Sequence, residues 1–223
     1  MGRMRNRSIT LTFHGIGDEP PQLDAGEREM WVSREQFLSV VDSAAARGDI
    51  RITFDDGNAS DIEHALPALR QRGMSATFFV VAGRMGQPGF LSEADVRALA
   101  DAGMAIGSHG MRHVPWRGLD DAALREELVD ARRLLEEVVA RPVFEAACPF
   151  GSYDRRVLRA LGRSGYRTVY TSDRGTSRPR DWVQARNTVR RSDNGSLFAE
   201  LSQAARPSRQ AMQRAKRMAK RLR

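Results

Sequence analysis

The sequence predicts a single α/β domain with a parallel sheet, most economically closed into a (β/α) barrel. Segments with strand and helix patterns alternate six or more times between residues 9 and 205. Short links join these segments, without a Gly/Ser-rich linker, an internal repeat or a low-complexity insert. Such alternation is typical of right-handed βαβ units. We expect a basic N-terminal extension over residues 1–8, one barrel over 9–205 and a basic tail over 206–223.

The first half of the chain supplies strands and helices in turn. Three apolar or alternating runs have strand patterns: residues 9–13, 50–54 and 76–81. The last of these is apolar throughout, as expected for a strand that is covered on both faces. Two capping-box patterns each predict a helix that ends at a glycine: Ser33 to Gln36 before Gly48, and Ser60 to Glu63 before Gly73.

The second half continues the alternation. Strand patterns cover residues 104–107, 143–147 and 168–171, and residues 183–189 have an extended pattern. Helices are predicted from Ser92 to Ala102, from Asp120 or Asp121 to about Val139, over 154–163 and over 196–205.

The positive charge of the chain is concentrated at its C-terminus. The net charge is +8, and residues 206–223 contain eight basic residues and no acidic ones. The rest of the chain contains 28 basic and 28 acidic residues and is therefore formally neutral. After Pro207 the pattern predicts a basic amphipathic helix, which suits an anionic membrane surface or an acidic partner; a solvated, frayed terminus is the alternative. No aromatic platform or binding motif accompanies it, so nucleic acid is not an expected partner.

Cysteine content and the N-terminal sequence bear on the compartment. Cys148 is the only cysteine, so the chain cannot form an intramolecular disulfide, and we expect a packed thiol rather than a nucleophile. The basic start is followed by a predicted strand rather than by an apolar signal segment, and no run has the length of a membrane span. We expect a cytoplasmic protein, which the tail could hold at the membrane surface.

Two adjacent carboxylates end the strand predicted over residues 50–54. Asp55 and Asp56 precede Gly57, and a fold that holds two repelling carboxylates together usually supplies a cation or a proton between them. The alternative is an Asp-Asp-Gly turn in which Asp56 caps the next helix.

Two histidines four residues apart follow another predicted strand. If the chain turns helically after Ser108, the rings of His109 and His113 lie on one side and can bind one ion. With one carboxylate they make a two-His, one-Asp set that suits Zn²⁺, with Co²⁺, Ni²⁺ and Mn²⁺ as alternatives. As an isolated pair, they could equally be surface or core histidines. His14 and Pro149 also follow predicted strands, and the carboxyl ends of barrel strands converge.

These motifs resemble those of a known family. Thr53-Phe-Asp-Asp-Gly57, Ser108-His109-x-x-x-His113 and Pro149-Phe150-Gly151 are similar, in order and spacing, to the first three motifs of the polysaccharide deacetylases. These carbohydrate esterases carry a chitooligosaccharide-deacetylase (NodB) homology domain, which folds as a distorted (β/α) barrel. The resemblance runs from about residue 9 to 190.

The resemblance implies a division of roles among the motif residues. Asp56, His109 and His113 would bind the metal, and Asp55 would be the general base. Pro149, Phe150 and Gly151 would contact the substrate, and the backbone N–H of Phe150 would help the metal to hold the oxyanion. The residues alone leave the mirror assignment open, with Asp55 as the ligand and Asp56 as the base.

The chain departs from the family pattern at two places. Many members of the family have an arginine that pairs with the base at the position of Ala147 in this chain. A branch of the family resembles this chain in having a small residue there. Arg186 is the predicted substitute for the missing arginine; the alternative is that it is a surface arginine. No histidine follows His113, where the family has a late Leu-His motif. We predict that His14 is the general acid rather than a loop histidine, because it follows the first strand; for His64 a packing role is expected.

The resemblance implies a metal-dependent hydrolase that removes an acetyl group, expected to be N-linked, from a sugar or polysaccharide precursor. Metal-activated water would attack the amide carbonyl. Asp181-Trp182 is similar to the fourth family motif and makes Trp182 a candidate sugar contact. The alternatives are a deformylase or O-deacetylase with the same site, or a non-catalytic carbohydrate-binding relative. A precursor is preferred to assembled wall only because of the expected cytoplasmic location.

Overall fold

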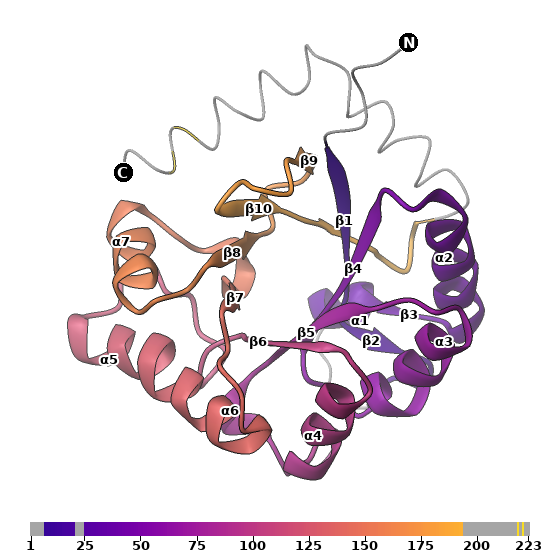
Figure 1. Ribbon diagram of the computed structural model, residues 1–223, viewed down its shortest axis with the longest axis horizontal. Helices are drawn as coiled ribbons and strands as arrows, with labels where there is room; N and C mark the ends of the chain where they lie inside the picture. Colours follow the sequence, from indigo (N-terminus) through magenta and orange to yellow (C-terminus); the bar gives the residue numbers. More distant parts are fainter. Residues whose placement is uncertain (1–6, 21–24, 194–217, 219, 221–223) are drawn as a thin grey trace.

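A nine-stranded sheet forms the centre of the protein (Figure 1). The computed structural model describes residues 7–20, 25–193, 218 and 220. The strands of this sheet follow the order β10-β8-β7-β6-β5-β4-β1-β11, with parallel neighbours, and β9 pairs antiparallel with β1. Their bounds are Ser8–Phe13 (β1), Ile50–Asp56 (β4), Ala76–Val80 (β5), Ala105–Ser108 (β6), Glu145–Ala147 (β7), Thr168–Thr171 (β8), Thr176–Ser177 (β9), Val183–Ala185 (β10) and Asn187–Thr188 (β11). A separate pair joins β2 (Gly15–Ile16) and β3 (Trp31–Val32).

The sheet curls into a barrel that is nearly closed, which confirms the predicted fold class. β10 pairs with β8 at one edge and β11 pairs with β1 at the other. The predicted extended segment 183–189 is therefore two short strands that belong to opposite edges of the sheet. Arg186 is the single residue between them, so the chain crosses the opening of the barrel at this arginine.

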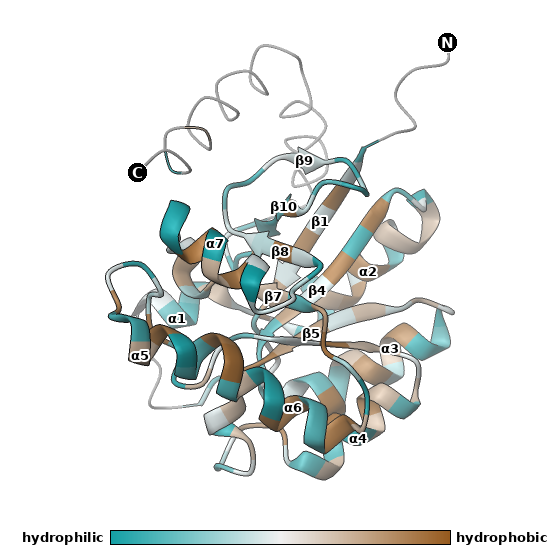
Figure 2. Ribbon diagram, turned by 60° about the vertical axis from the view of Figure 1, so that its left-hand side comes forward, coloured by the Kyte–Doolittle hydropathy of each residue, from teal (hydrophilic) through white to brown (hydrophobic). Residues whose placement is uncertain are grey.

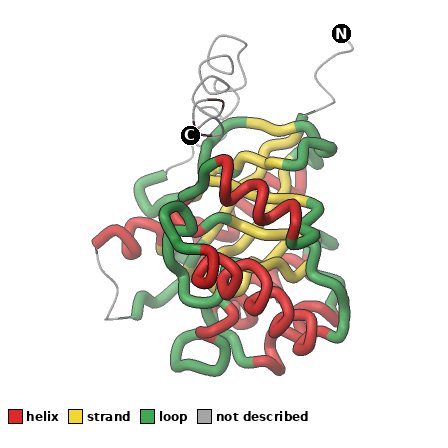
Figure 3. Tube along the Cα trace, turned by 90° about the vertical axis from the view of Figure 1, so that its left-hand side faces the viewer, coloured by secondary structure: helices red, strands yellow, loops and turns green. Residues whose placement is uncertain are grey.

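Helices α2 to α7 surround the barrel on its outside, and α1 lies behind the strands in Figure 1, beside β2 and β3 (Figures 1 and 3). The α-helices are Ala25–Met30 (α1), Arg34–Arg47 (α2), Leu66–Gln71 (α3), Glu93–Asp101 (α4), Asp121–Arg125 (α5), Ala131–Val139 (α6) and Arg155–Arg163 (α7). Two π-helical turns, Asp61–Ala65 (η1) and Glu126–Asp130 (η3), precede α3 and α6, and two 3₁₀ turns cover Ala82–Arg84 (η2) and Pro149–Gly151 (η4). The helix predicted from Asp120 to Val139 is thus a run of α5, η3 and α6.

An aromatic cluster packs the outer face of the sheet against α2. Phe13 and Phe54 stack at 5.6 Å between ring centroids, and Phe54 stacks on Phe78 at 4.5 Å. Phe37 of α2 meets Phe13 edge-on at 5.1 Å. In Figure 2 the apolar colour follows these strands, while the helices alternate apolar and polar along their length. Because strand side chains alternate, the residues next to these phenylalanines point into the barrel.

Helix caps follow the sequence prediction in part. In the capping box predicted from Ser33 to Gln36 only the bond to the Ser33 hydroxyl forms, because the Gln36 side chain donates to the carbonyl groups of Arg190 and Asp193 instead. Ser33, Asp120 and Asp154 each accept a backbone N–H three residues on, and Ser92 forms a full capping box with Asp95. The capping box predicted from Ser60 to Glu63 was wrong, because Ser60 already has helical dihedral angles and caps nothing. Its hydroxyl accepts the N–H of Ile16 at 3.2 Å instead, which ties the start of η1 to β2.

Part of the sequence prediction lies outside the described residues. The helix expected over 196–205 is among them, and so is the tail over 206–223 apart from Met218 and Lys220. Among the helices that the structure describes, none has the length and apolar character needed to cross a membrane.

Candidate metal and catalytic site

The site forms where β1 and β4 end side by side. Thr12 pairs in register with Thr53, and their hydroxyl groups are in hydrogen-bond contact. Two residues further along the same inner face come His14 and Asp55. Parallel pairing and the alternation of side chains therefore bring a histidine from strand one and a carboxylate from strand four to the mouth of the barrel.

Asp55 is buried and paired with Arg186. Nη1 and Nη2 of the arginine lie 2.5 and 2.7 Å from Oδ1 and Oδ2 of the aspartate, which is a bidentate ion pair. Both side chains are at most 4% exposed. Arg186 can reach the carboxylate from inside the barrel because its backbone crosses the opening between β10 and β11. The structure thus places it where the sequence predicted a substitute for the missing motif arginine.

The surroundings of Asp55 keep it ionised. Burial alone would raise the pKa of this carboxyl, but the charges of Arg186 and then His109, with the hydrogen bonds of Arg186, hold the pKa below its usual value. Oδ2 lies 3.7 Å from Nε2 of His109. A buried carboxylate that stays charged, and accepts hydrogen bonds from one side only, is suited to accept a proton from a group on its other side.

Asp56 turns away from Asp55 because the strand ends in a left-handed conformation. Its φ is 77°, a region that aspartate tolerates better than most residues. This turn brings Oδ1 to 3.1 Å from Nε2 of His113 and 3.5 Å from Nε2 of His109. Burial acts to raise the pKa of Asp56, but the adjacent His113 imidazole and the charges of His14 and His109 hold that pKa well below its usual range.

His109 presents a lone pair toward Asp56. It follows β6 directly, and its Nδ1 donates to the carbonyl oxygen of Ala147 at 2.8 Å. This bond places the proton of the neutral ring on Nδ1 and leaves Nε2 free to bind an ion. Burial, against the attraction of Asp55 and Asp56, lowers the pKa of His109 to about 4, so the ring is neutral at pH 7.

His113 reaches the same point without a helix. The residues between the two histidines form a loop with positive φ at Gly110 and His113, so the helical turn that the sequence suggested is absent between them. The two imidazole centroids still lie 5.2 Å apart. On its other side, Nδ1 of His113 is 3.3 Å from Nη2 of Arg84.

A buried glutamate that the sequence analysis missed holds this loop in shape. The carboxylate of Glu127, in η3, accepts the backbone N–H groups of Met111 at 2.8 Å and Arg112 at 3.0 Å. It also accepts the indole N–H of Trp116 at 3.3 Å. A Cβ on Gly110 would lie 2.2 Å from Oε2 of Glu127, so only glycine fits there. The helical pattern of 120–139 gave no sign that one of its acids points inward.

A third carboxyl, also missed, lies behind the pair. Asp61 opens η1, has no exposed surface, and neither of its carboxylate oxygens has a hydrogen-bond partner among the described residues. Burial, followed by the charges of Asp56 and Asp55, raises the pKa of Asp61 well above its usual value. A protonated Asp61 adds no third negative charge to the site.

Asp56, His109 and His113 make a donor set that fits a divalent transition ion. One ligand atom from each lies within 4.8 Å of the other two. Oδ1 of Asp56 is buried and lacks a well-directed hydrogen-bond donor among the residues described. Two imidazoles and one carboxylate suit Zn²⁺ and its neighbours in the transition series.

The other two histidines lie in different places. His14 is half-buried, its charge contributes to the low pKa values of Asp55 and Asp56, and its buried Nδ1 has no hydrogen-bond partner within the described chain. It therefore lies at the site. His64 packs in η1 against Gly17, whose Cβ would lie 3.1 Å from its Nε2.

The third motif lies at the rim of the site. Phe150 has a φ of 56° and is 66% exposed, and its ring centroid is 4.7 Å from that of His113. Pro149 and Gly151 are buried beside it. Cys148 is buried as well, and burial raises the pKa of its thiol to about 12, which suits the packed role predicted for it rather than a nucleophile.

The structure places Trp182, the predicted sugar contact, away from the candidate catalytic site. It precedes β10 and so lies at the amino end of that strand, away from the carboxyl ends where the site forms. Its indole donates to the carbonyl of Tyr166 at 3.1 Å, and its ring packs with the apolar residues of α7. Asp181-Trp182 therefore resembles the fourth family motif in sequence but does not lie at the carboxyl ends of the strands, where the site forms.

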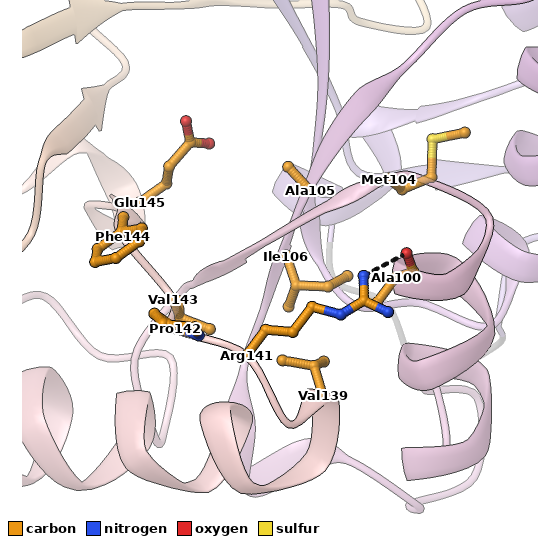
Figure 4. Close-up of a pocket in the computed structure, with 10 residues that line it drawn as sticks. All are labelled: Ala100, Met104, Ala105, Ile106, Val139, Arg141, Pro142, Val143, Phe144 and Glu145. Carbon is orange, nitrogen blue, oxygen red and sulfur yellow. Dashed lines mark hydrogen bonds between the residues drawn. The ribbon is translucent and has the colours of Figure 1, made fainter.

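A cavity of about 260 Å³ opens at the opposite end of the barrel (Figure 4). Its lining includes the first residues of β6 and β7, Ala105 and Glu145, with Arg141 at its edge. Arg141 donates to the carbonyl of Ala100 at 3.0 Å, and Thr77 donates to Glu145 at 3.0 Å. The cavity contains no group of metal-binding side chains and is remote from Asp55 and Asp56.

Comparisons with known proteins agree with this geometry. A family model described as "Polysaccharide deacetylase" matches residues 42–169. The chain is 27% identical over 177 residues to the YxkH protein of Bacillus subtilis, and 31% identical over 135 residues to a peptidoglycan-N-acetylglucosamine deacetylase of Bacillus cereus. These matches cover 78% and 60% of the chain, but 63% and 60% of the relatives, so the chain spans about three fifths of their length. The crystal structure of a polysaccharide deacetylase from Bacillus cereus has the same fold, with a TM-score of 0.77 at 20% identity over 88% of this chain and 69% of that one.

Proposed function

Because the chain belongs to the polysaccharide deacetylase family, we propose that it hydrolyses the N-acetyl group of an acetylated saccharide in a metal-dependent reaction. One observation carries the proposal: a two-His, one-Asp donor set lies beside a second, arginine-held carboxylate. This combination separates an ion-binding carboxylate from a proton-accepting one. The peptidoglycan-N-acetylglucosamine deacetylase among the similar proteins supports N-acetylated glycans as the substrate class.

Asp56, His109 and His113 would hold the metal, with Zn²⁺ as the proposed ion. A divalent ion in this place activates a water molecule and polarises the amide carbonyl. The chain prepares the ligands beforehand: Ala147 fixes the tautomer of His109, and Glu127 fixes the loop that carries His113.

Asp55 would act as the general base. It lies on the inner face of β4 and is held by Arg186 on the side away from solvent. The arginine both fixes the rotamer of the carboxylate and keeps it ionised, so that it can accept the proton of the attacking water.

His14 would act as the general acid and protonate the leaving amine. It follows β1, the strand next to the one that carries the two aspartates, and its Nδ1 has no hydrogen-bond partner among the described residues. An imidazole is suited to this step because its proton is exchanged near neutral pH.

Acetate release tests the proposal directly. The full chain, loaded with Zn²⁺, should release acetate from N-acetylglucosamine oligomers, and removal of the metal with a chelator should abolish this release until metal is restored. Formate release from N-formyl analogues, or acetate from O-acetylated sugars only, would point to the deformylase or O-deacetylase alternative. Saccharide binding without turnover in the metal-loaded protein would refute the enzymatic proposal.

A further inference from the structure

A second polar site lies on the same face of the barrel, around Asp173. This residue follows β8 and is therefore at the carboxyl end of its strand, like the residues of the candidate catalytic site. Its side chain is 6% exposed. Tyr153 and Thr171 both donate their hydroxyl groups to Oδ2, at 2.6 and 2.9 Å. They fix the carboxylate and leave Oδ1 directed elsewhere.

A primary ammonium group occupies the remaining side of this carboxylate. Nζ of Lys220 donates to Oδ1 of Asp173 at 2.8 Å and to the carbonyl oxygen of Gly151 at 3.4 Å. It also lies 5.2 Å from the centroid of the Tyr153 ring. A carboxylate, a carbonyl and an aromatic face are the three kinds of group that recognise an ammonium ion.

This place is close to the candidate catalytic site. Gly151, whose carbonyl accepts from Lys220, follows Phe150, whose ring contacts that of His113 at a tilt of 39°. A cavity of about 100 Å³ next to Lys220 is lined by Gly151, Ser152, Tyr153 and Arg117. A ligand that extends along the rim past Phe150 would therefore meet Asp173.

We infer that Asp173, Gly151 and Tyr153 form a binding site for the free amine of a de-N-acetylated sugar residue, and that Lys220 is a resident competitor for it. The inference rests on the proposed function, because only an N-deacetylase places free amines beside the acetylated residue it acts on. The side chain of Lys220 is 44% exposed, so it can leave the site without disturbing the core. The site would favour glycans that already carry amines.

Calorimetric titration of the full chain tests this site without turnover. The ligand is a β-1,4-linked glucosamine tetramer below the pKa of its amines, and the matched neutral ligand is cellotetraose, which has a hydroxyl group in place of each amine. Lys220→Met should bind the glucosamine tetramer about tenfold more tightly than the wild type. This factor is expected if Lys220 occupies the site in the wild type and leaves it free about one-tenth of the time. Asp173→Asn should bind it at least about tenfold more weakly than the wild type, since a charge-assisted hydrogen bond is lost. Lys216→Met controls for the loss of one tail charge and should bind like the wild type.

Several outcomes would overturn the inference. Equal affinity of all four proteins for the glucosamine tetramer would do so, and so would an equal gain of Lys220→Met for both ligands, which would make Lys220 a steric cover. These results are independent of the proposed function. If acetate release fails while amine binding depends on Asp173, the ammonium site stands alone; if acetate release succeeds and the affinities are equal, only the ammonium site is refuted.

Discussion

Replacing Arg186 should damage the protein in two measurable ways. Arg186→Met removes one member of a bidentate pair whose side chains are 1% and 4% exposed, and leaves the carboxylate of Asp55 buried without its partner. Breaking such a pair from one side costs about 3–5 kcal/mol of unfolding free energy. For a domain of this size that corresponds to a fall in Tm of about 6–20 °C. The control is Arg133→Met, which removes an arginine whose side chain is 78% exposed and should cost at most about 1 kcal/mol.

The same substitution should shift the pH dependence of activity. In the wild type the pKa of Asp55 is lowered, so its contribution to stability is present above its unfolded pKa and is lost as the pH falls through the folded pKa. Without Arg186, burial raises the pKa of Asp55, and the acidic limb of kcat/KM should move to higher pH. The assays are thermal unfolding and a pH–rate profile of acetate release.

The double variant Asp55→Asn/Arg186→Met separates ion pairing from packing. It removes both charges, so it should be more stable than Arg186→Met alone, because no buried charge is left unpaired. A Tm for Arg186→Met that falls no further than that of Arg133→Met would refute the reasoning, as would an acidic limb that does not move.

Three further predictions follow from the residues around the pair. Glu127→Gln replaces one accepting oxygen with an NH₂ group that faces the backbone N–H of Met111 or Arg112. Metal affinity, measured against a competing chelator, should therefore fall about 10–100-fold. Unchanged affinity would mean that the loop does not depend on this carboxylate. Asp61→Asn replaces a carboxyl whose pKa is raised, so its stability should be near wild type in acid and should exceed wild type at neutral pH. The gain should be about 1.4 kcal/mol for each pH unit between the unfolded pKa and either the folded pKa or the assay pH, whichever is lower. Equal denaturant midpoints at both pH values would contradict that account. His14→Asn should keep its metal and lose about 10²–10⁴-fold in kcat, and a rate near wild type would remove His14 from the reaction.

The fold could be predicted because its signals are local. The alternating strand and helix patterns, and the helix start at Ser92, depend on neighbouring residues and were confirmed. The two short strands β10 and β11 could not be separated, because their division depends on which distant strands they pair with. The capping box predicted at Ser60 was wrong for a related reason: its hydroxyl accepts the backbone N–H of Ile16, in β2, instead of an N–H of its own helix.

The site could be predicted in part for the same physical reason. Asp55, Asp56 and His109 stand at or next to strand ends, where the chain order itself brings them to one rim, and His113 follows His109 after four residues. The partnership of Arg186 with Asp55 was anticipated only through a family resemblance. Glu127 and Asp61 gave no local signal, because a buried carboxyl in a helix looks like a solvent-facing one until its neighbours are known. Trp182 shows the opposite error, a motif match at the wrong end of a strand.

We propose different tasks for the two adjacent aspartates: Asp56 holds the ion and Asp55 accepts the proton. The most direct test is the metal content per chain of Asp55→Asn and Asp56→Asn after both variants are loaded and dialysed with wild type under the same conditions. We expect Asp55→Asn to retain one equivalent of Zn²⁺, like the wild type, and Asp56→Asn to lose it. Retention by Asp56→Asn together with loss by Asp55→Asn would contradict the assignment and exchange the two roles.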